Sequence, residues 1–185
     1  MIPVGDSQRS GRVPWVNYTV ILANVALFVF MLGLSTGIAP TNRQAFQDFE
    51  EQTRGVCYGF ETRPSEADRF ICTWAFQPKE FFDTVGGESG LTGEARWQAI
   101  LSIVVSIFMH GGWLHIIGNM LFLGVFGDNV EDRMGHLGYL LFLLASGVVA
   151  SLLQGAMDPE SVVPVLGASG AVAGVLGAYI VWYPN

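Results

Sequence analysis

Long apolar runs, separated by short polar connections and one long polar segment, organise the chain. The runs at 97–127 and 134–157 contain no Asp, Glu, Lys or Arg. Runs of this length can cross a hydrocarbon core about 30 Å thick. The pattern predicts an all-α, polytopic membrane protein with a first span at about 16–36, in which Asn24 is expected to bond to a neighbouring helix.

The second run is too long for one plain span and is interrupted at His110-Gly111-Gly112. Paired glycines favour a turn over a continuous helix. We therefore expect a short membrane-embedded helix over 98–109, followed by a tight turn and a complete span. The remaining predicted spans are 113–127, 136–154 and 169–183, with a turn at Asp158-Pro159-Glu160 before the last.

The polar segment at 37–96 carries ten acidic and six basic residues, a mixture typical of an extramembrane loop. Loops this long are often functional. Within it, 45–52 predicts a short surface helix, and 75–85 mixes aromatic and charged residues as interfacial segments do. Cys57 and Cys72 are compatible either with a disulfide, worth about 3 kcal/mol for a loop of about 15 residues, or with two free thiols.

The distribution of Lys and Arg in the tail and the short connections predicts the orientation. The tail at 1–14 has two arginines, the connection at 128–135 has one and the connection at 155–165 has none. The tail and 128–135 are therefore expected in the cytoplasm, and the long first loop outside. The predicted organisation is a cytoplasmic tail, 1–14, and a membrane domain, 15–185.

Composition excludes several functions. Only 14% of residues are charged, against about 25% in a typical soluble domain. The net charge of −7 comes mostly from the first loop, and no basic patch or nucleic-acid motif is present.

A metal site at His110 and His115 is disfavoured, because no Asp, Glu or Cys lies in the apolar segments to complete it and five-residue spacing is unusual for zinc.

Three polar residues at the second span are candidates for chemistry, because polar groups in spans are costly and usually functional or paired. His115 and Asn119 are four residues apart and project from one helical face. His110 precedes that helix, and the glycine turn can bring it close to the same point. These side chains can donate hydrogen bonds to an oxygen, or they can simply hold helices together.

Ser169 lies in a stretch of small residues, GASG at 167–170, downstream of Pro164. An extended entry to the last span places Ser169 near a helix N-terminus, where free N–H groups and the dipole favour a developing negative charge. Three small residues spaced by four predict a face for close helix packing, namely Gly170, Gly174 and Ala178. Taken alone, the GASG motif is better explained by helix packing. Together with the HxxxxHxxxN motif on another span, it is better explained by a nucleophilic role of Ser169.

The segments at 108–142 and 163–179 resemble the rhomboid family of intramembrane serine proteases. The specific features are HxxxxHxxxN, ExxxG at Glu131–Gly135 and GASG, in this order. The similarity covers about 97–185, with a looser match through the first span and AFQPKEFF. The resemblance implies a six-span helical core, of which this chain holds the first four spans.

The resemblance also implies a role for each motif residue. Ser169 would be the nucleophile, and Asn119, His115 and the Ser169 backbone N–H would form the oxyanion hole. His110 would support the surrounding hydrogen-bond network. The residues with structural roles would be Glu131, Gly167, Gly170 and Gly174.

The sequence departs from the family in one respect. The rhomboid catalytic base is a histidine on the sixth span, and this chain ends after the predicted fourth. The only other histidine, His136, begins the third span on the cytoplasmic side. We expect the chain to be a fragment, inactive alone, because a serine hydroxyl without an adjacent base is a weak nucleophile.

The resemblance implies an endopeptidase that cleaves transmembrane protein substrates through a Ser-His dyad, in contact with the lipid bilayer. It implies no metal or organic cofactor, and a multi-pass location in the bacterial inner membrane. The alternative is an inactive rhomboid-like protein that binds transmembrane clients. A transporter is disfavoured, because the polar residues cluster at one site instead of lining a path.

Overall fold

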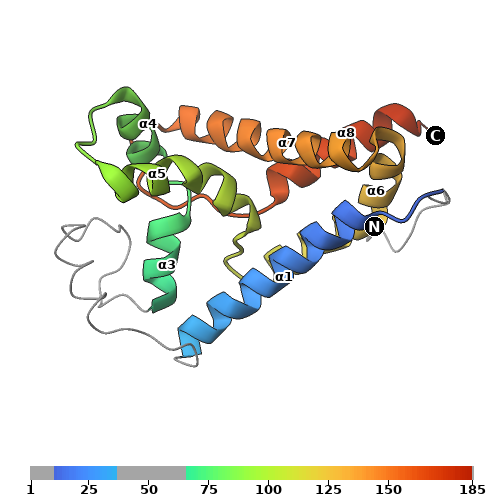
Figure 1. Ribbon diagram of the computed structural model, residues 1–185, viewed down its shortest axis with the longest axis horizontal. Coiled ribbons are helices and arrows are strands. Elements are labelled where there is room, and N and C mark those ends of the chain that lie inside the picture. The colour runs from blue at the N-terminus through green and yellow to red at the C-terminus, as the bar shows by residue number, and fades with distance from the viewer. Residues whose placement is uncertain (1–10, 37–65, 185) are drawn as a thin grey trace.

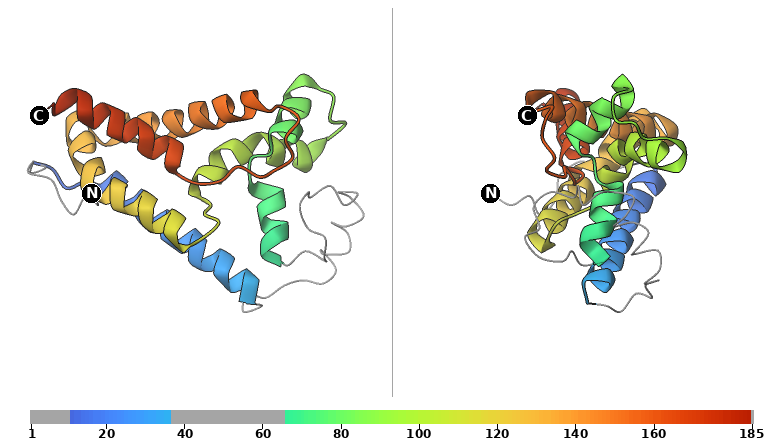
Figure 2. Two further views of the ribbon diagram at one scale, coloured as in Figure 1. Left: turned by 180° about the vertical axis from the view of Figure 1, so that it is seen from behind. Right: turned by 90° about the vertical axis from the view of Figure 1, so that its left-hand side faces the viewer.

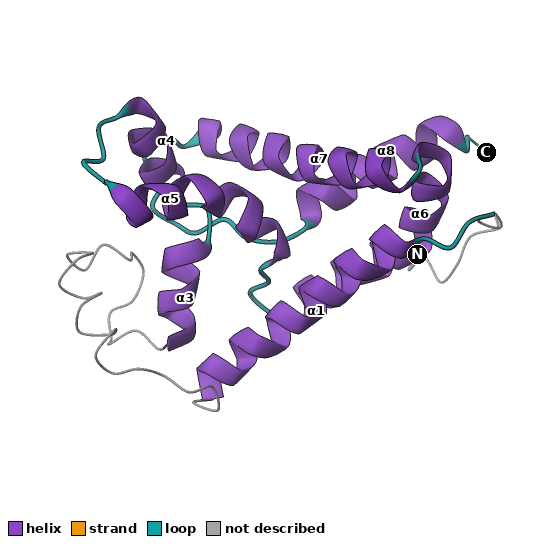
Figure 3. Ribbon diagram, in the orientation of Figure 1, coloured by secondary structure: helices purple, strands orange, loops and turns teal. Residues whose placement is uncertain are grey.

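A computed structural model describes residues 11–36 and 66–184 (Figure 1). Every regular element in these residues is a helix, and one antiparallel bridge pairs Phe76 with Val165 (Figure 3). The helices are α1 (Trp15–Thr36), α3 (Glu66–Trp74), α4 (Pro78–Gly86), α5 (Gly93–Val105), the 3-10 helix η1 (Ser106–Phe108), α6 (Trp113–Met134), α7 (His136–Met157) and α8 (Ser169–Trp182). The predicted all-α fold is confirmed.

The longest helices form two pairs that converge at one end of the molecule (Figures 1 and 2). α1 packs on α6 and α7 packs on α8, while α8 also contacts α6 and so joins the two pairs. A core of buried residues from α1, η1, α6, α7 and α8 fills this junction. The helices α3, α4 and α5 lie at the opposite end, where the two pairs diverge (Figure 1).

Two helices, α1 and α7, are long and apolar enough to cross a membrane, each with a mean hydropathy of 2.0. α5 with η1 and α6 pass the same test only as a pair, bent by 75° at the break that contains Gly111 and Gly112. α8 is apolar but has 14 residues, against about 20 for an untilted span. The sequence predicts four spans. The described residues contain two helices that are long and apolar enough to be spans, or three if the bent pair counts as one span.

The predicted connection at 128–135 is wrong. α6 continues through Met134, and Gly135 alone separates it from α7. Gly135 has a φ of 74°, a left-handed conformation that glycine adopts without strain. The charged residues at the end of α6 remain helical because Glu131 has partners at the start of α1, and Asp132 has one in the segment before it.

The long polar segment contains structure that its sequence predicts only in part. α4 covers most of the segment at 75–85 and has Pro78 as its first residue, where proline is favoured. α3 precedes it and carries Cys72, which is disulfide-bonded. The other cysteine, Cys57, and the helix predicted at 45–52 lie outside the described residues.

Two fully buried asparagines on α1 form hydrogen bonds to different parts of the structure. Asn17 donates to the Leu123 carbonyl oxygen of α6 at 2.9 Å and accepts from the Tyr139 hydroxyl of α7 at 2.8 Å. Asn24 instead donates to the Val20 carbonyl oxygen of its own helix at 2.7 Å. The bond predicted from Asn24 to a neighbouring helix is wrong, because this short side chain reaches back one turn to its own backbone.

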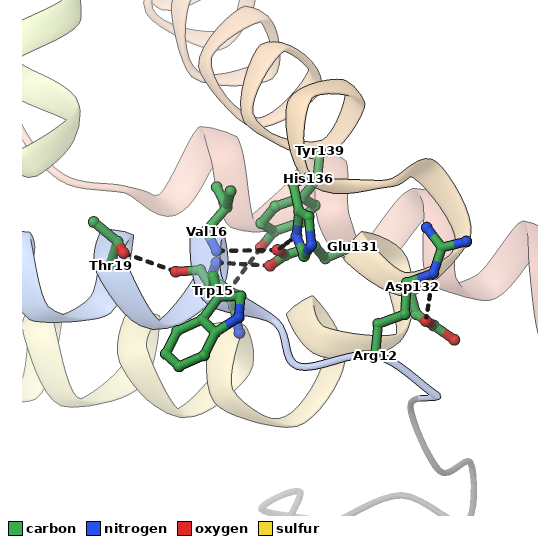
Figure 4. Close-up of polar contacts among 9 residues, drawn as sticks. Arg12, Trp15, Val16, Thr19, Glu131, Asp132, His136 and Tyr139 are labelled. Carbon is green, nitrogen blue, oxygen red and sulfur yellow. Dashed lines mark hydrogen bonds and ion pairs between the residues drawn. The ribbon is translucent and has the colours of Figure 1, made fainter.

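A buried carboxylate holds α1 against the end of α6 (Figure 4). Glu131 is 1% exposed and accepts hydrogen bonds from the backbone N–H groups of Val16 at 3.0 Å and Asn17 at 2.7 Å. These are among the N–H groups that a helix start leaves without a partner in the helix. His136 Nδ1, at the start of α7, lies 2.5 Å from the same carboxylate. Glu131 thus joins three helices at one point.

Glu131→Gln is expected to lower the free energy of unfolding by about 2–3 kcal/mol, because it replaces a charged acceptor of two backbone N–H groups by a neutral amide. Unfolding in mixed micelles measures this change. The control is Asp132→Asn. Asp132 is part-exposed, accepts from the Gly11 N–H at 3.1 Å and lies 4.0 Å from Arg12, so its loss should cost about 0–1 kcal/mol. Equal losses in the two variants would contradict a specific role for Glu131.

Candidate active site

His110 lies in the break between η1 and α6 and is almost fully buried. Its Nε2 atom lies 3.0 Å from Asn119 Nδ2 and 3.5 Å from the backbone N of Ala168. Both neighbours are N–H donors, so Nε2 is an unprotonated acceptor and the neutral ring carries its proton on Nδ1. His110 therefore links α6 to the segment that enters α8.

The neighbours of Asn119 determine the orientation of its side-chain amide. Nδ2 also donates to the His115 carbonyl oxygen, one turn earlier, at 3.0 Å. An amide oxygen at this position would face two acceptors, so the nitrogen must lie here. Both amide hydrogens are consequently engaged, one by the His115 backbone and one by His110.

The His115 ring packs on the glycine two positions before Ser169. A Cβ atom built on Gly167 would lie 2.5 Å from His115 Nε2, closer than real contacts allow. Gly167 also has a φ of 122°, in the left-handed region that favours glycine, and its N–H donates to the Ser106 carbonyl oxygen at 2.9 Å. Only glycine fits here, and its absent side chain makes room for the imidazole. The ring centroids of His115 and His110 are 5.0 Å apart, edge to face.

Ser169 is the first residue of α8, and Ala168 is its N-terminal cap. The serine is exposed and lines a pocket of about 670 Å³ between α7 and the segment that leads into α8. Its hydroxyl has no hydrogen-bond partner among residues 11–36 and 66–184. The helix start supplies free backbone N–H groups and the positive end of a helix dipole beside this hydroxyl.

Two glycines set the depth at which α8 packs on α7. A Cβ atom on Gly170 would overlap the side chain of Ala150, and one on Gly174 would lie 2.5 Å from Ser146 Cβ. This is the close approach that a face of small residues permits. Because α8 begins at Ser169, the packing of these glycines also positions the serine.

Gly174→Val is expected to lower the free energy of unfolding by about 1–3 kcal/mol, because the added side chain overlaps Ser146 and forces the helices apart. The matched control is Gly177→Val on the same helix, where an added Cβ meets no atom within 4 Å. Unfolding in mixed micelles, followed by tryptophan fluorescence, compares the two. A control variant that is as unstable as Gly174→Val would mean that valine in α8, and not the helix contact, is responsible.

The polar wall of the pocket is not among the features predicted from the sequence. Ser151 and Gln154 of α7, and Asp158 directly after it, line the same pocket as Ser169. The available signal was Gln154, an amide inside a long apolar run. The described residues contain no group of three His, Cys, Asp or Glu side chains placed to hold a metal ion.

These observations define a class of protein: a helical membrane protein with a serine at a helix N-terminus, beside two histidines and an asparagine. A serine hydroxyl can act as a nucleophile. Amide, imidazole and backbone N–H groups can stabilise the oxyanion that such an attack produces. The arrangement is chemically suited to acyl transfer.

Comparison with known proteins identifies the family. Residues 96–185 match the family model of the Rhomboid domain. RHOMBOID-like protein 1 of Arabidopsis thaliana is 28% identical over 177 residues, which cover 90% of this chain and 39% of the relative. Rhomboid protease GluP of Bacillus subtilis (strain 168) is 34% identical over 93 residues, which cover 50% of this chain and 17% of the relative. The chain belongs to the rhomboid family.

The matches cover 39%, 53% and 34% of the first three curated relatives, so the chain spans about half of their length or less. Their names include a mitochondrial and a chloroplastic protein of Arabidopsis thaliana, and the predicted bacterial inner membrane therefore gains no support. The family and the apolar helices establish an integral membrane protein in contact with the lipid bilayer. No solved structure matches the chain significantly.

Proposed function

We propose that the protein is an intramembrane serine endopeptidase, which cleaves peptide bonds in or near the transmembrane segments of other membrane proteins. The observation that carries this proposal is the position of Ser169 at the start of α8, with the loop before it held by His110 and His115. Close helix packing requires small residues but does not require two imidazole rings at the same point. The name of one relative, Rhomboid protease GluP, adds support.

In the proposed reaction, Ser169 Oγ attacks the carbonyl carbon of the substrate and its proton passes to a base. Asn119, the His115 ring and the Ser169 backbone N–H donate to the oxyanion, each side chain contributing about 3–4 kcal/mol. The C–N bond then breaks, the base protonates the leaving amine, and an acyl-enzyme remains. Water attacks this ester, gives a proton to the base and releases the second product, which restores the Ser169 hydroxyl.

We assign the base to a histidine outside these 185 residues. His110 Nε2 is occupied as an acceptor from Asn119 and Ala168, and His115 is assigned to the oxyanion. His136 contacts Glu131, which is three turns beyond Asn119 along α6, or about 18 Å away. None of the three therefore suits proton removal from Ser169.

We also place Ser169 toward the outer side of the membrane. The Arg133 guanidinium lies 5.7 Å from the Trp182 ring, so the far end of α8 adjoins the end of α6. The Gly11 N–H donates to Asp132 at this same end, opposite to Ser169. Arginines favour the cytoplasmic side, and Arg12 and Arg133 both lie at the end remote from Ser169.

The direct test is covalent labelling of the full-length protein in detergent by a fluorophosphonate, followed by mass spectrometry of the labelled peptide. The proposal requires the label on Ser169. A folded full-length protein that cleaves no transmembrane substrate and takes up no label would refute it.

A second candidate is a protein that binds transmembrane clients without cleaving them. The observation that favours it is the Ser169 hydroxyl, which has no partner among residues 11–36 and 66–184. Co-purification of a client with an unlabelled, folded full-length protein would support this function over proteolysis.

A further inference from the structure

One face of α7, continued by Asp158, lines one side of the pocket that contains Ser169. The residues on this wall are small near the serine and polar further along: Gly147, Ala150, Ser151 and Gln154 of α7, and then Asp158 directly after the helix. Ala150 lies beside Gly170, next to Ser169. Asp158 is eight residues further, a rise of about 12 Å. An extended peptide advances about 3.3 Å per residue, so three to four residues span this distance.

Asp158 is the one ionisable side chain in the pocket lining, and no described Lys, Arg or His lines it. The one basic residue of α4 is already engaged: Lys79 Nζ lies 2.6 Å from Glu160 and 3.4 Å from Asp83. The hydrogen bond that Lys79 donates to Glu160 raises the pKa of Lys79 and keeps this side chain charged. Asp158 forms no ion pair within residues 66–184.

We propose that Asp158 selects substrates that carry a Lys or Arg three to four residues from the cleaved bond. A bound cationic side chain would meet the one charge in the pocket, whereas an acidic side chain would be repelled by it. The geometry of the α7 wall determines the distance from Ser169, and the charge of Asp158 determines the preference. This inference rests on the proposed function, because it takes Ser169 as the point of cleavage.

The test uses the full-length protein and a single-span substrate in which each of the positions near the cleaved bond is replaced in turn by Lys or by Glu. The measured quantity is the ratio of kcat/KM for the Lys substrate to that for the Glu substrate. We expect a ratio of about two- to fivefold at the third or fourth residue on one side, as for an exposed ion pair, because Asp158 is exposed. At the other positions we expect a ratio near one. A higher ionic strength should narrow the ratio.

Two variants and one control test whether Asp158 causes the preference for Lys over Glu. Asp158→Asn should bring the ratio to one, and Asp158→Lys should invert it. Glu160→Gln removes an acid two residues away that is paired with Lys79 and lies outside the lining, and it should keep the wild-type ratio. A ratio that is the same in the wild type and in Asp158→Lys would overturn the proposal.

Failure of the inference and failure of the proposed function give different results. Cleavage and Ser169 labelling with a ratio insensitive to Asp158 refute the inference alone. If no cleavage occurs, fluorescence anisotropy with Ser169→Ala measures binding of the same Lys and Glu substrates. If Ser169→Ala binds the Lys substrate more tightly than the Glu substrate, and Ser169→Ala/Asp158→Asn does not, Asp158 recognises the cationic side chain. Equal affinities of Ser169→Ala for the two substrates would overturn this role of Asp158.

Discussion

Ser169→Ala is expected to lower kcat for cleavage of a transmembrane substrate by more than about 10⁴-fold, and to abolish fluorophosphonate labelling. Alanine removes the Oγ atom that forms the acyl-enzyme, and no other described hydroxyl has the same position at the start of α8. The substitution leaves the backbone N–H groups and the packing of Gly170 in place. The fold and substrate affinity should therefore be retained, which separates loss of chemistry from loss of structure.

Ser146→Ala is the matched control for this variant. Ser146 lies on α7 against Gly174, so its hydroxyl belongs to the same pair of helices but lies more than one turn of α8 from Ser169. The control should retain labelling and cleavage. Residual cleavage by Ser169→Ala close to the wild-type rate would exclude Ser169 as the nucleophile and favour the client-binding function.

Much of the candidate site could be predicted from the sequence because its geometry is local. The four-residue spacing of His115 and Asn119 places them on one helical face, and α8 does begin at Ser169. The polar wall of the pocket, in contrast, depends on contacts between helices that are distant in sequence. Ser151 and Gln154 approach the serine only because α7 packs on α8, and no spacing within α7 indicates that contact.

The fold predictions that are wrong share a physical cause. The charged residues in 128–135 predict a connection between two spans, yet they continue α6, and Glu131 receives its hydrogen bonds from α1, 114 and 115 positions earlier in the chain. Local pattern cannot distinguish a charge in water from a charge with a distant partner. Asn24 shows the reverse error, since its bond is to its own helix.

The two ends of α6 therefore have different chemistry. At one end, Glu131 joins α1, α6 and α7 through a charged acceptor. At the other, His110 and Asn119 join α6 to the start of α8 through neutral groups that can exchange partners.

Asn119→Ala is expected to lower kcat by about 10²–10³-fold, as for removal of one oxyanion donor, with a smaller change in KM. In the resting structure both amide hydrogens of Asn119 are engaged, by the His115 carbonyl oxygen and by His110 Nε2. The first bond lies within one turn of α6. The bond to His110 is therefore the one we expect the amide to give up when the oxyanion forms.

This exchange has a consequence that can be measured with a double-mutant cycle. If His110 acts by holding the Asn119 amide, His110→Ala should cost less than Asn119→Ala, and the double variant should be no slower than Asn119→Ala alone. Asn129→Ala is the control for truncation of a buried asparagine on α6, remote from Ser169, and should retain kcat. If the losses of transition-state stabilisation in the two single variants add up in the double variant, His110 and Asn119 act independently. If kcat of Asn119→Ala is near that of the wild type, Asn119 is not part of the oxyanion hole.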